Sequence, residues 1–371
     1  MKTLFTHWRL LILAVFLAGV IVVGVNSIQP RPGEAEPPLR ETSVPVGRLA
    51  SPTASAQTGT LAQASPTPEP TVTPEPLLFT FPTPKVPVTI WRPPLYDVPW
   101  APTPNDHFYF IRPIAADQVN WPDPTYRYGG IFFEGITHTG VDIPADQDAP
   151  VLAAGSGKVV WAGYGLYSGP DAPDDPYGLA VVIEHDFGYQ GKSLFTLYAH
   201  MSRVDVIRGQ YVETGQTVGH VGDTGFTTGY HLHFEVRVGE NFLYASSNPE
   251  LWTAPPQGWG VLVGRIMGTG GQLLYRYPVT VRNLQTRQRW TVITYGSELD
   301  VNSDPYYREN MVIGDLPAGN YQIEIGYLGR TLEWQTTIQP GQVTYFTFRG
   351  RNGFFDDPPP TPEVEFTPVA P

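Results

Sequence analysis

The sequence contains no cysteine, and basic residues are scarce in it. Its 371 residues include 23 Lys and Arg against 35 Asp and Glu, which gives a formal net charge of -12. Without cysteine the chain cannot form disulfides or thiolate zinc sites, and it cannot carry a lipid-modified cysteine anchor. The acidic balance argues against a nucleic-acid partner, because nucleic-acid binding requires basic patches.

Proline, by contrast, is abundant and clustered. The chain has 40 prolines, about twice average usage, and residues 29–104 are rich in Pro, Thr, Ser, Ala and Glu. Such a segment cannot bury enough apolar surface to offset its ordering entropy, so we predict a disordered linker. At about 3.1 Å per residue in polyproline form it would reach at most about 220 Å. A featureless linker without a tuned length is the alternative.

The N-terminus combines positive charge with an apolar run. Lys2 and Arg9 precede the uncharged stretch from Leu10 to Val25. This length falls between a signal-peptide core of about 7–15 residues and a membrane span of about 20. Residues 1–28 are therefore predicted to be a signal anchor or a cleaved signal peptide. The charges before the run place the rest of the chain outside the cytoplasm, either membrane-anchored or secreted.

From Phe108 onward the composition favours strands, and little of it has helical periodicity. Aromatic and β-branched runs separated by glycine turns predict strands at 158–161, 179–183, 193–198 and 231–238. Residues 186–191 are predicted to connect two of these strands as a hairpin. The segment 105–252 is thus expected to be one mainly β domain with antiparallel strands.

Pro255 and Pro256 mark a predicted boundary. Alternation resumes at 279–282, 321–325 and 344–348, with turn residues between these runs. This spacing predicts a small β-sandwich over 259–350. Residues 354–371 are Pro-rich and are expected to form a disordered tail.

Two short patterns contain residues that can bind a metal. His231 and His233 alternate within a predicted strand, so both side chains share one face about 7 Å apart. His138 and Asp142 would lie about 13 Å apart in a straight strand, but Gly140 between them permits a bend that closes this gap. A catalytic zinc site requires three ligands from His, Asp or Glu and one open position. These residues can supply them.

Three segments along the chain then carry a family resemblance. They are His138–Ile143, Tyr198–Met201 and Gly222–Glu235, in that order. This set resembles the lysostaphin-type (LytM-like) zinc metalloendopeptidases, which cut peptide cross-links of bacterial peptidoglycan. The resemblance covers roughly residues 126–240. It implies a compact antiparallel β fold, described for the family as a duplicated hybrid motif, with its site in an open groove.

The resemblance also assigns roles to individual residues. It makes His138, Asp142 and His233 the ligands of a Zn2+ ion. It makes His200 and His231 the pair that acts on the bound water and on the scissile carbonyl. No His-Glu-x-x-His glutamate is present, and we favour His231 as general base and His200 as donor to the transition state, with an exchange of the two roles left open.

Some residues near these motifs have alternative readings. The connection 164–177 is long for the family and carries Asp171, Asp174 and Asp175, which predict a solvated acidic loop or a site that attracts amino groups of peptides. Glu235 is either a partner of a metal ligand or a solvated or structural carboxylate. His185 and His220 are expected to be structural and surface residues.

The C-terminal segment carries a second, shorter resemblance. Residues 314–321 are similar to the turn-and-strand signature of carboxypeptidase-regulatory-like domains, and this part is expected to bind wall or protein, or to act as a spacer. The leading functional hypothesis is an extracytoplasmic zinc metalloendopeptidase (peptide bond hydrolase) that acts on peptidoglycan cross-links. The alternative is a non-catalytic wall-binding or hydrolase-regulating relative, and a third is a peptidase for secreted proteins.

Overall fold

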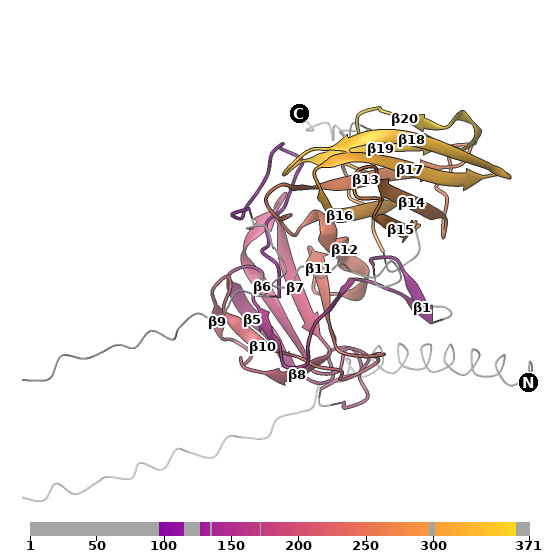
Figure 1. Cartoon of the computed structure of the whole chain (residues 1–371). Coiled ribbons are helices and arrows are strands. Elements are labelled where there is room, and N and C mark those ends of the chain that lie inside the picture. Colours follow the sequence, from indigo (N-terminus) through magenta and orange to yellow (C-terminus); the bar gives the residue numbers. More distant parts are fainter. Residues whose placement is uncertain (1–95, 115–126, 134–135, 171, 297–300, 361–371) are drawn as a thin grey trace, which may run out of the picture. The chain divides into compact units, whose positions relative to one another are not determined.

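A computed structural model describes residues 96–114, 127–133, 136–170, 172–296 and 301–360 (Figure 1). The predicted signal segment 1–28 and most of the predicted linker lie outside these ranges, as do the last residues of the predicted tail. Within the described ranges, no helix has the length and apolar character needed to cross a bilayer.

The first part of the described chain is built on a seven-stranded sheet. Its order is β12-β11-β7-β6-β5-β9, and β3 also pairs with β11, on the same edge as β12. All the pairings within this sheet are antiparallel, as predicted. Its strands β5, β6, β7 and β11 are labelled in Figure 1. The strands are β3 (Val141–Pro144), β5 (Gly157–Gly163), β6 (Ala180–Tyr189), β7 (Lys192–Ala199), β9 (Tyr211–Val212), β11 (His231–Val238) and β12 (Ser246–Ser247).

Two smaller sheets accompany it. One has the order β4-β10-β8 and the other pairs β1 with β2. Short 3-10 helices follow β11 and β12. The bounds are β1 (Ile131–Phe133), β2 (Ile136–Thr137), β4 (Pro150–Leu152), β8 (Met201–Val204), β10 (Thr217–Val221), η2 (Leu243–Ala245) and η3 (Pro249–Leu251).

The predicted strands are confirmed, but the predicted hairpin connection is too long. β6 continues to Tyr189 and β7 begins at Lys192, so the turn consists of Gln190 and Gly191 alone. Both residues have positive φ, 51° and 76°, as a two-residue hairpin turn of the primed type requires. Residues 186–189, which the sequence assigned to the connection, are therefore part of the strand.

β11 shows most clearly how the sequence specifies its strand. Leu232, Phe234 and Val236 are fully buried in the main hydrophobic cluster. The residues that alternate with them are His231, His233, Glu235 and Arg237, and these polar side chains are also buried. Because successive side chains on a strand point to opposite faces, β11 has one apolar face and one buried polar face. The polar face is the unusual one, because charged and polar side chains are seldom fully buried.

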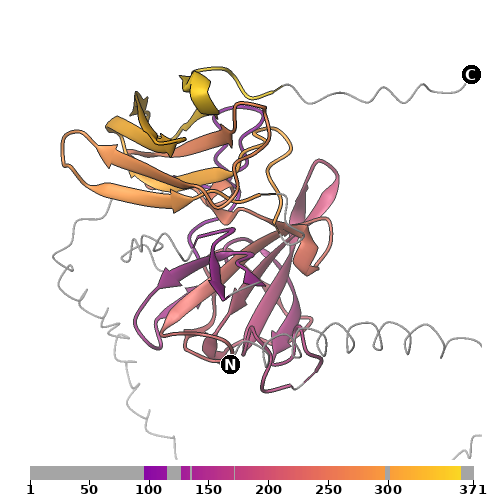
Figure 2. The same cartoon turned by 90° about the vertical axis from the view of Figure 1, so that its right-hand side faces the viewer.

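The C-terminal part consists of two four-stranded sheets that face each other (Figure 2). A second hydrophobic cluster contains residues of both sheets. Their orders are β16-β13-β19-β20 and β15-β14-β17-β18, and the β13–β19 pairing is parallel. This is the small β-sandwich that the alternation predicts. Its elements are β13 (Trp259–Met267), β14 (Pro278–Asn283), β15 (Arg289–Ile293), β16 (Met311–Pro317), β17 (Gly319–Tyr327), β18 (Arg330–Ile338), β19 (Val343–Arg349), η4 (Gly350–Asn352) and β20 (Phe354–Phe355).

The main hydrophobic cluster continues across Pro255 and Pro256. It contains Trp252 on one side of these prolines and Val261 and Tyr345 on the other. The end of the predicted linker joins the same packing, because Trp100 packs against this cluster. Its indole Nε1–H also donates to the Gly341 carbonyl at 2.8 Å. The two β parts are therefore packed against each other through apolar side chains.

We expect a Gly140→Ala substitution to lower the free energy of unfolding by about 1–3 kcal/mol, as overpacking does. A Cβ at this position would lie 2.4 Å from the Phe234 carbonyl oxygen, so β3 would have to move away from β11. Urea unfolding measures the change. Gly326→Ala is the control, because a Cβ there meets nothing within 4 Å. Equal effects of the two substitutions would contradict the close approach.

Candidate metal centre

The three predicted ligands come from a bend and from two paired strands. His138 follows β2, the chain bends at Gly140, and Asp142 lies in β3. β3 pairs antiparallel with β11 so that Asp142 stands opposite His233. The bend that the sequence predicts at Gly140 therefore brings His138 and Asp142 to the same point of the polar face of β11.

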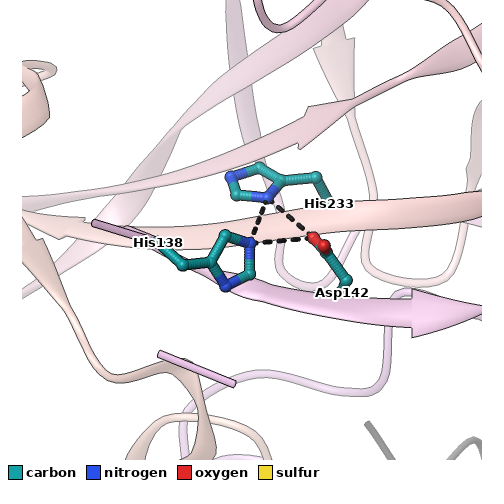
Figure 3. A group of neighbouring side chains, drawn as sticks. All are labelled: His138, Asp142 and His233. Carbon is teal, nitrogen blue, oxygen red and sulfur yellow. Dashed lines mark hydrogen bonds and ion pairs between the residues drawn. The ribbon is translucent and has the colours of Figure 1, made fainter. Parts of the chain in front are cut away.

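The three side chains converge on one point (Figure 3). His138 Nε2 lies 2.9 Å from Asp142 Oδ1 and 2.9 Å from His233 Nδ1, and the latter two atoms are also 2.9 Å apart. All three residues are buried. The group has the composition and closeness of a metal site.

Hydrogen bonds on the far side of each ring determine which nitrogen faces the centre as an acceptor. His138 Nδ1 lies 3.1 Å from the Arg127 carbonyl oxygen, and His233 Nε2 lies 3.0 Å from Glu235 Oε1. Both partners only accept, so these outer nitrogens carry the protons. When both rings are neutral, the inner nitrogens point lone pairs at each other and at a carboxylate oxygen. Such an arrangement favours a cation, either a second proton on His233 or a metal ion, and two imidazoles with one carboxylate fit zinc.

The pKa shifts of Asp142 and His233 also indicate that the centre favours a positive charge. Burial alone would raise the pKa of Asp142, but the adjacent His138 and His233 hold it well below its usual range. Burial opposes protonation of His233, yet the carboxylates of Asp142 and Glu235, which accept hydrogen bonds from the ring, raise its pKa to about 9. The two carboxylates therefore favour a cation between them.

His200 and His231 stand beside this group. Their ring centroids are 4.8 Å apart, and the His200 ring lies 5.7 Å from that of His233. His200 Nδ1 lies 2.7 Å from the Thr224 carbonyl and His231 Nδ1 lies 2.8 Å from the Gly229 carbonyl. Each Nδ1 therefore carries a proton, and each Nε2 of the neutral ring is an acceptor.

Burial keeps both of these rings neutral. It lowers the pKa of His200 to about 3, helped by repulsion from His233 and His231. Burial also lowers the pKa of His231, although Asp142 works against this shift. His231 Nε2 lies 3.5 Å from Asp142 Oδ2. A positive charge on His231 is thus stabilised by a nearby carboxylate.

The backbone at His200 is itself unusual. This residue follows the last residue of β7 and has φ 59°, a conformation that few non-glycine residues adopt. Its N–H donates to the Tyr177 carbonyl at 2.9 Å. Such conformations persist where the surroundings impose them, and they gather at functional sites. Here the conformation turns the chain between β7 and β8.

Glu235 is a partner of a metal-ligand candidate, and the solvated interpretation of it is wrong. Its side chain is fully buried. Besides His233, it accepts hydrogen bonds from the hydroxyls of Thr139 at 2.6 Å and Tyr177 at 2.8 Å, and from Arg237 Nε at 2.7 Å. The alternation of β11 places Glu235 and Arg237 on the histidine face, whereas nothing local in the sequence points to Tyr177.

The long connection 164–177 is also different from the solvated acidic loop that we predicted. Asp175 is fully buried and accepts hydrogen bonds from the backbone N–H groups of Tyr167, Ser168 and Tyr177. Asp174 is exposed, and Asp171 lies outside the described residues. Asp175 therefore holds the loop that delivers Tyr177, and it is not free to attract a ligand.

Two other histidines lie apart from the centre, as expected. His185 is buried and lies 2.9 Å from Thr196 Oγ1 and 3.1 Å from the Ser156 carbonyl. His220 pairs with Asp205 at 2.9 Å, in a partly exposed cluster. Their surroundings account for both as structural residues.

Comparison with known proteins agrees with this geometry. Residues 136–244 match the sequence profile of Peptidase family M23. This segment is thus similar to that family, and it includes His138, Asp142, His200, His231 and His233.

Several curated relatives align with the same region. The chain is 35% identical over 128 residues to the DD-carboxypeptidase/endopeptidase Mpg of Neisseria meningitidis, which is 34% of this chain and 26% of that protein. It is 33% identical over 157 residues to lysostaphin of Staphylococcus simulans, covering 42% and 29%. It is 37% identical over 103 residues to the peptidoglycan DD-endopeptidase ShyB of Vibrio cholerae, covering 28% and 21%. Each match thus spans less than a third of the relative.

Among solved structures, the catalytic domain of lysostaphin from Staphylococcus simulans aligns with 28% identity and a TM-score of 0.28. This alignment covers 36% of this chain and 86% of that domain.

We expect Glu235→Gln to weaken zinc binding about 10–100-fold, the usual effect of losing the partner of a ligating histidine. The neutral amide no longer holds the Nε2 proton of His233 as firmly, and it leaves Arg237 without its carboxylate. Competition with a chromophoric chelator measures the affinity. Asp106→Asn is the control, since this buried carboxylate accepts from Tyr307 and Thr103 and has no bond to the centre. Unchanged affinity of Glu235→Gln would show that Glu235 has a packing role only.

Proposed function

We propose that the chain is an extracytoplasmic zinc metalloendopeptidase that hydrolyses peptide bonds in peptidoglycan cross-links. The observation that carries this proposal is the convergence of two imidazole lone pairs and one carboxylate oxygen, each 2.9 Å from the others. A second pair of imidazoles beside this centre supports hydrolysis over simple metal storage. The names of the relatives, peptidoglycan DD-endopeptidase and lysostaphin, support the substrate class.

His138 Nε2, Asp142 Oδ1 and His233 Nδ1 are the proposed ligands. Bound there, zinc supplies Lewis-acid activation of a water molecule and polarisation of a carbonyl. Arg127 and Glu235 hold the two ligating rings by their outer nitrogens, so that the lone pairs stay aimed at the ion.

His231 is the proposed general base. Its Nδ1–H is anchored on the Gly229 carbonyl, so Nε2 is the acceptor nitrogen of the neutral ring and the atom that takes up a proton. The resulting imidazolium is stabilised by Asp142 Oδ2 at 3.5 Å. It can then pass the proton to the departing amine.

His200 is the proposed donor to the developing oxyanion. Its neutral ring keeps its single proton on Nδ1, facing the Thr224 carbonyl at 2.7 Å. His200 therefore donates from Nε2 only as an imidazolium, which burial disfavours before the substrate arrives. A carbonyl that gains negative charge in the transition state favours that protonated form.

The remaining parts of the proposal concern location and accessory segments. The charged and apolar N-terminus supports export, with residues 1–28 as an anchor or a cleaved signal and residues 29–104 as a spacer. Residues 105–252 are the proposed peptidase domain, 259–350 the β-sandwich domain, with carboxypeptidase-regulatory-like character, and 354–371 the tail. The alternative, a non-catalytic wall-binding or hydrolase-regulating relative, does not require the two additional histidines beside the metal group.

Incubating the full chain with purified peptidoglycan is expected to release fragments with new amino termini, identifiable by mass spectrometry. A chelator should abolish the release and added Zn2+ should restore it, because the ligands alone supply no Lewis acid. Bound zinc without any release, from wall or from test proteins, would favour the non-catalytic alternative. Release from proteins alone would indicate a peptidase for secreted proteins.

Single His231→Ala and His200→Ala variants are each expected to lower kcat about 10²–10⁴-fold, the usual contribution of general acid–base catalysis. Zinc content should stay near that of the parent, since neither ring is a proposed ligand. His220→Ala serves as control, because this residue pairs with Asp205 away from the centre. A variant that loses zinc along with activity would instead make that histidine a ligand.

A further inference from the structure

One turn, formed by residues 127–130, holds the proposed ligand His138 at three atoms. The His138 N–H donates to the Gly130 carbonyl at 2.8 Å, and the His138 carbonyl accepts from the Gly129 N–H at 2.8 Å. The imidazole Nδ1 lies 3.1 Å from the Arg127 carbonyl. The position and the ring orientation of His138 are therefore set by this turn.

The far side of the turn is fastened to the C-terminal part of the chain through Tyr128. Its buried hydroxyl accepts from the Asn302 N–H at 2.7 Å and lies 3.1 Å from the Ser246 carbonyl. Its ring packs edge-to-face on Tyr295, with centroids 5.2 Å apart. Asn302 and Tyr295 both lie in the connection between β15 and β16.

The neighbouring residues of the turn are held in the same way. Gly129 has φ 78°, and a Cβ there would lie 2.3 Å from the Cβ of Tyr295, so the backbone rests directly on that side chain. The Arg127 guanidinium pairs with the buried carboxylate of Glu250. Glu250 in turn accepts from the backbone N–H of Gly314, in β16, at 2.5 Å.

These contacts form a continuous path from the β-sandwich to the metal group. We propose that the β-sandwich of residues 259–350 is a positioning element of the metal centre, which it supports through residues 127–129 and His138. A partner that orients a ligating histidine contributes to metal affinity even though it never touches the metal. This inference rests on the metal site of the proposed function, and it is independent of the substrate.

Other contacts join the two β parts without reaching a ligand. The Tyr307 hydroxyl donates to Asp106 Oδ1 at 2.5 Å, and Arg112 pairs with Asp315. The partners of Asp106 and Arg112 in these contacts are Tyr307 and Asp315, which are not proposed ligands. These contacts provide a comparison in which the same two parts are joined but no ligand is oriented.

The test compares two single hydroxyl deletions, Tyr128→Phe and Tyr307→Phe, in the full chain. Both remove a buried hydroxyl that bridges the two parts, so both are expected to lower the midpoint of urea unfolding. Only Tyr128→Phe is expected to raise the dissociation constant of Zn2+, by about tenfold or more, as measured by chelator competition under native conditions. Glu250→Gln, which weakens the hold on Arg127, is expected to act in the same direction.

The inference is overturned if Tyr128→Phe and Glu250→Gln bind zinc as tightly as the parent. It is also overturned if Tyr307→Phe loses as much zinc affinity as Tyr128→Phe. If Tyr128→Phe fails to fold, Glu250→Gln alone decides between these outcomes. If the parent chain binds zinc and digests wall but Tyr128→Phe keeps full zinc affinity, only this inference is wrong. If the parent chain binds no zinc, the proposed function is wrong as well.

Discussion

Three electron-rich atoms lie 2.9 Å apart in a buried site, and the Arg127 carbonyl and Glu235 hold the two rings that supply two of them. Left alone, two imidazole lone pairs and a carboxylate oxygen repel one another, and burial strengthens that repulsion. The rings stay in place because each outer nitrogen is bound to a fixed acceptor. A metal ion resolves the conflict, since it can accept from all three atoms at once.

The same requirement explains the polar face of β11. A buried strand normally has apolar residues on both faces, but here His231, His233, Glu235 and Arg237 occupy one of them. Each needs partners, because an unpaired buried charge is costly. Glu235 balances Arg237 and receives His233, and Arg237 reaches further to Tyr177 and Asn241. The polar face is therefore a connected network, and its centre is the metal group.

The family resemblance assigned the residues of this centre, and local patterns were compatible with it. The alternation in His231-x-His233 places both rings on one face of a strand, and Gly140 permits the bend that brings His138 and Asp142 together. The supports of the centre could not be predicted in the same way. Arg127 acts through its backbone carbonyl, which any residue has, and Tyr177 reaches Glu235 across 58 positions of sequence. The prediction that Asp175 is solvated was wrong, because the local sequence does not indicate that three backbone N–H groups donate to this carboxylate.

The C-terminal part raises the same issue at a larger scale. Pro255 and Pro256 and the resumed alternation indicate a separate module, and its two sheets do enclose their own hydrophobic cluster. Yet Val261, Tyr295 and Tyr345 belong to the cluster that also contains Trp252 and Phe234. Removing residues 259–350 would expose this apolar surface and release the turn that holds His138. Prolines and the pattern of alternation show where the chain passes from one sheet to another. Which residues form one cooperative unit depends instead on which side chains share a hydrophobic core.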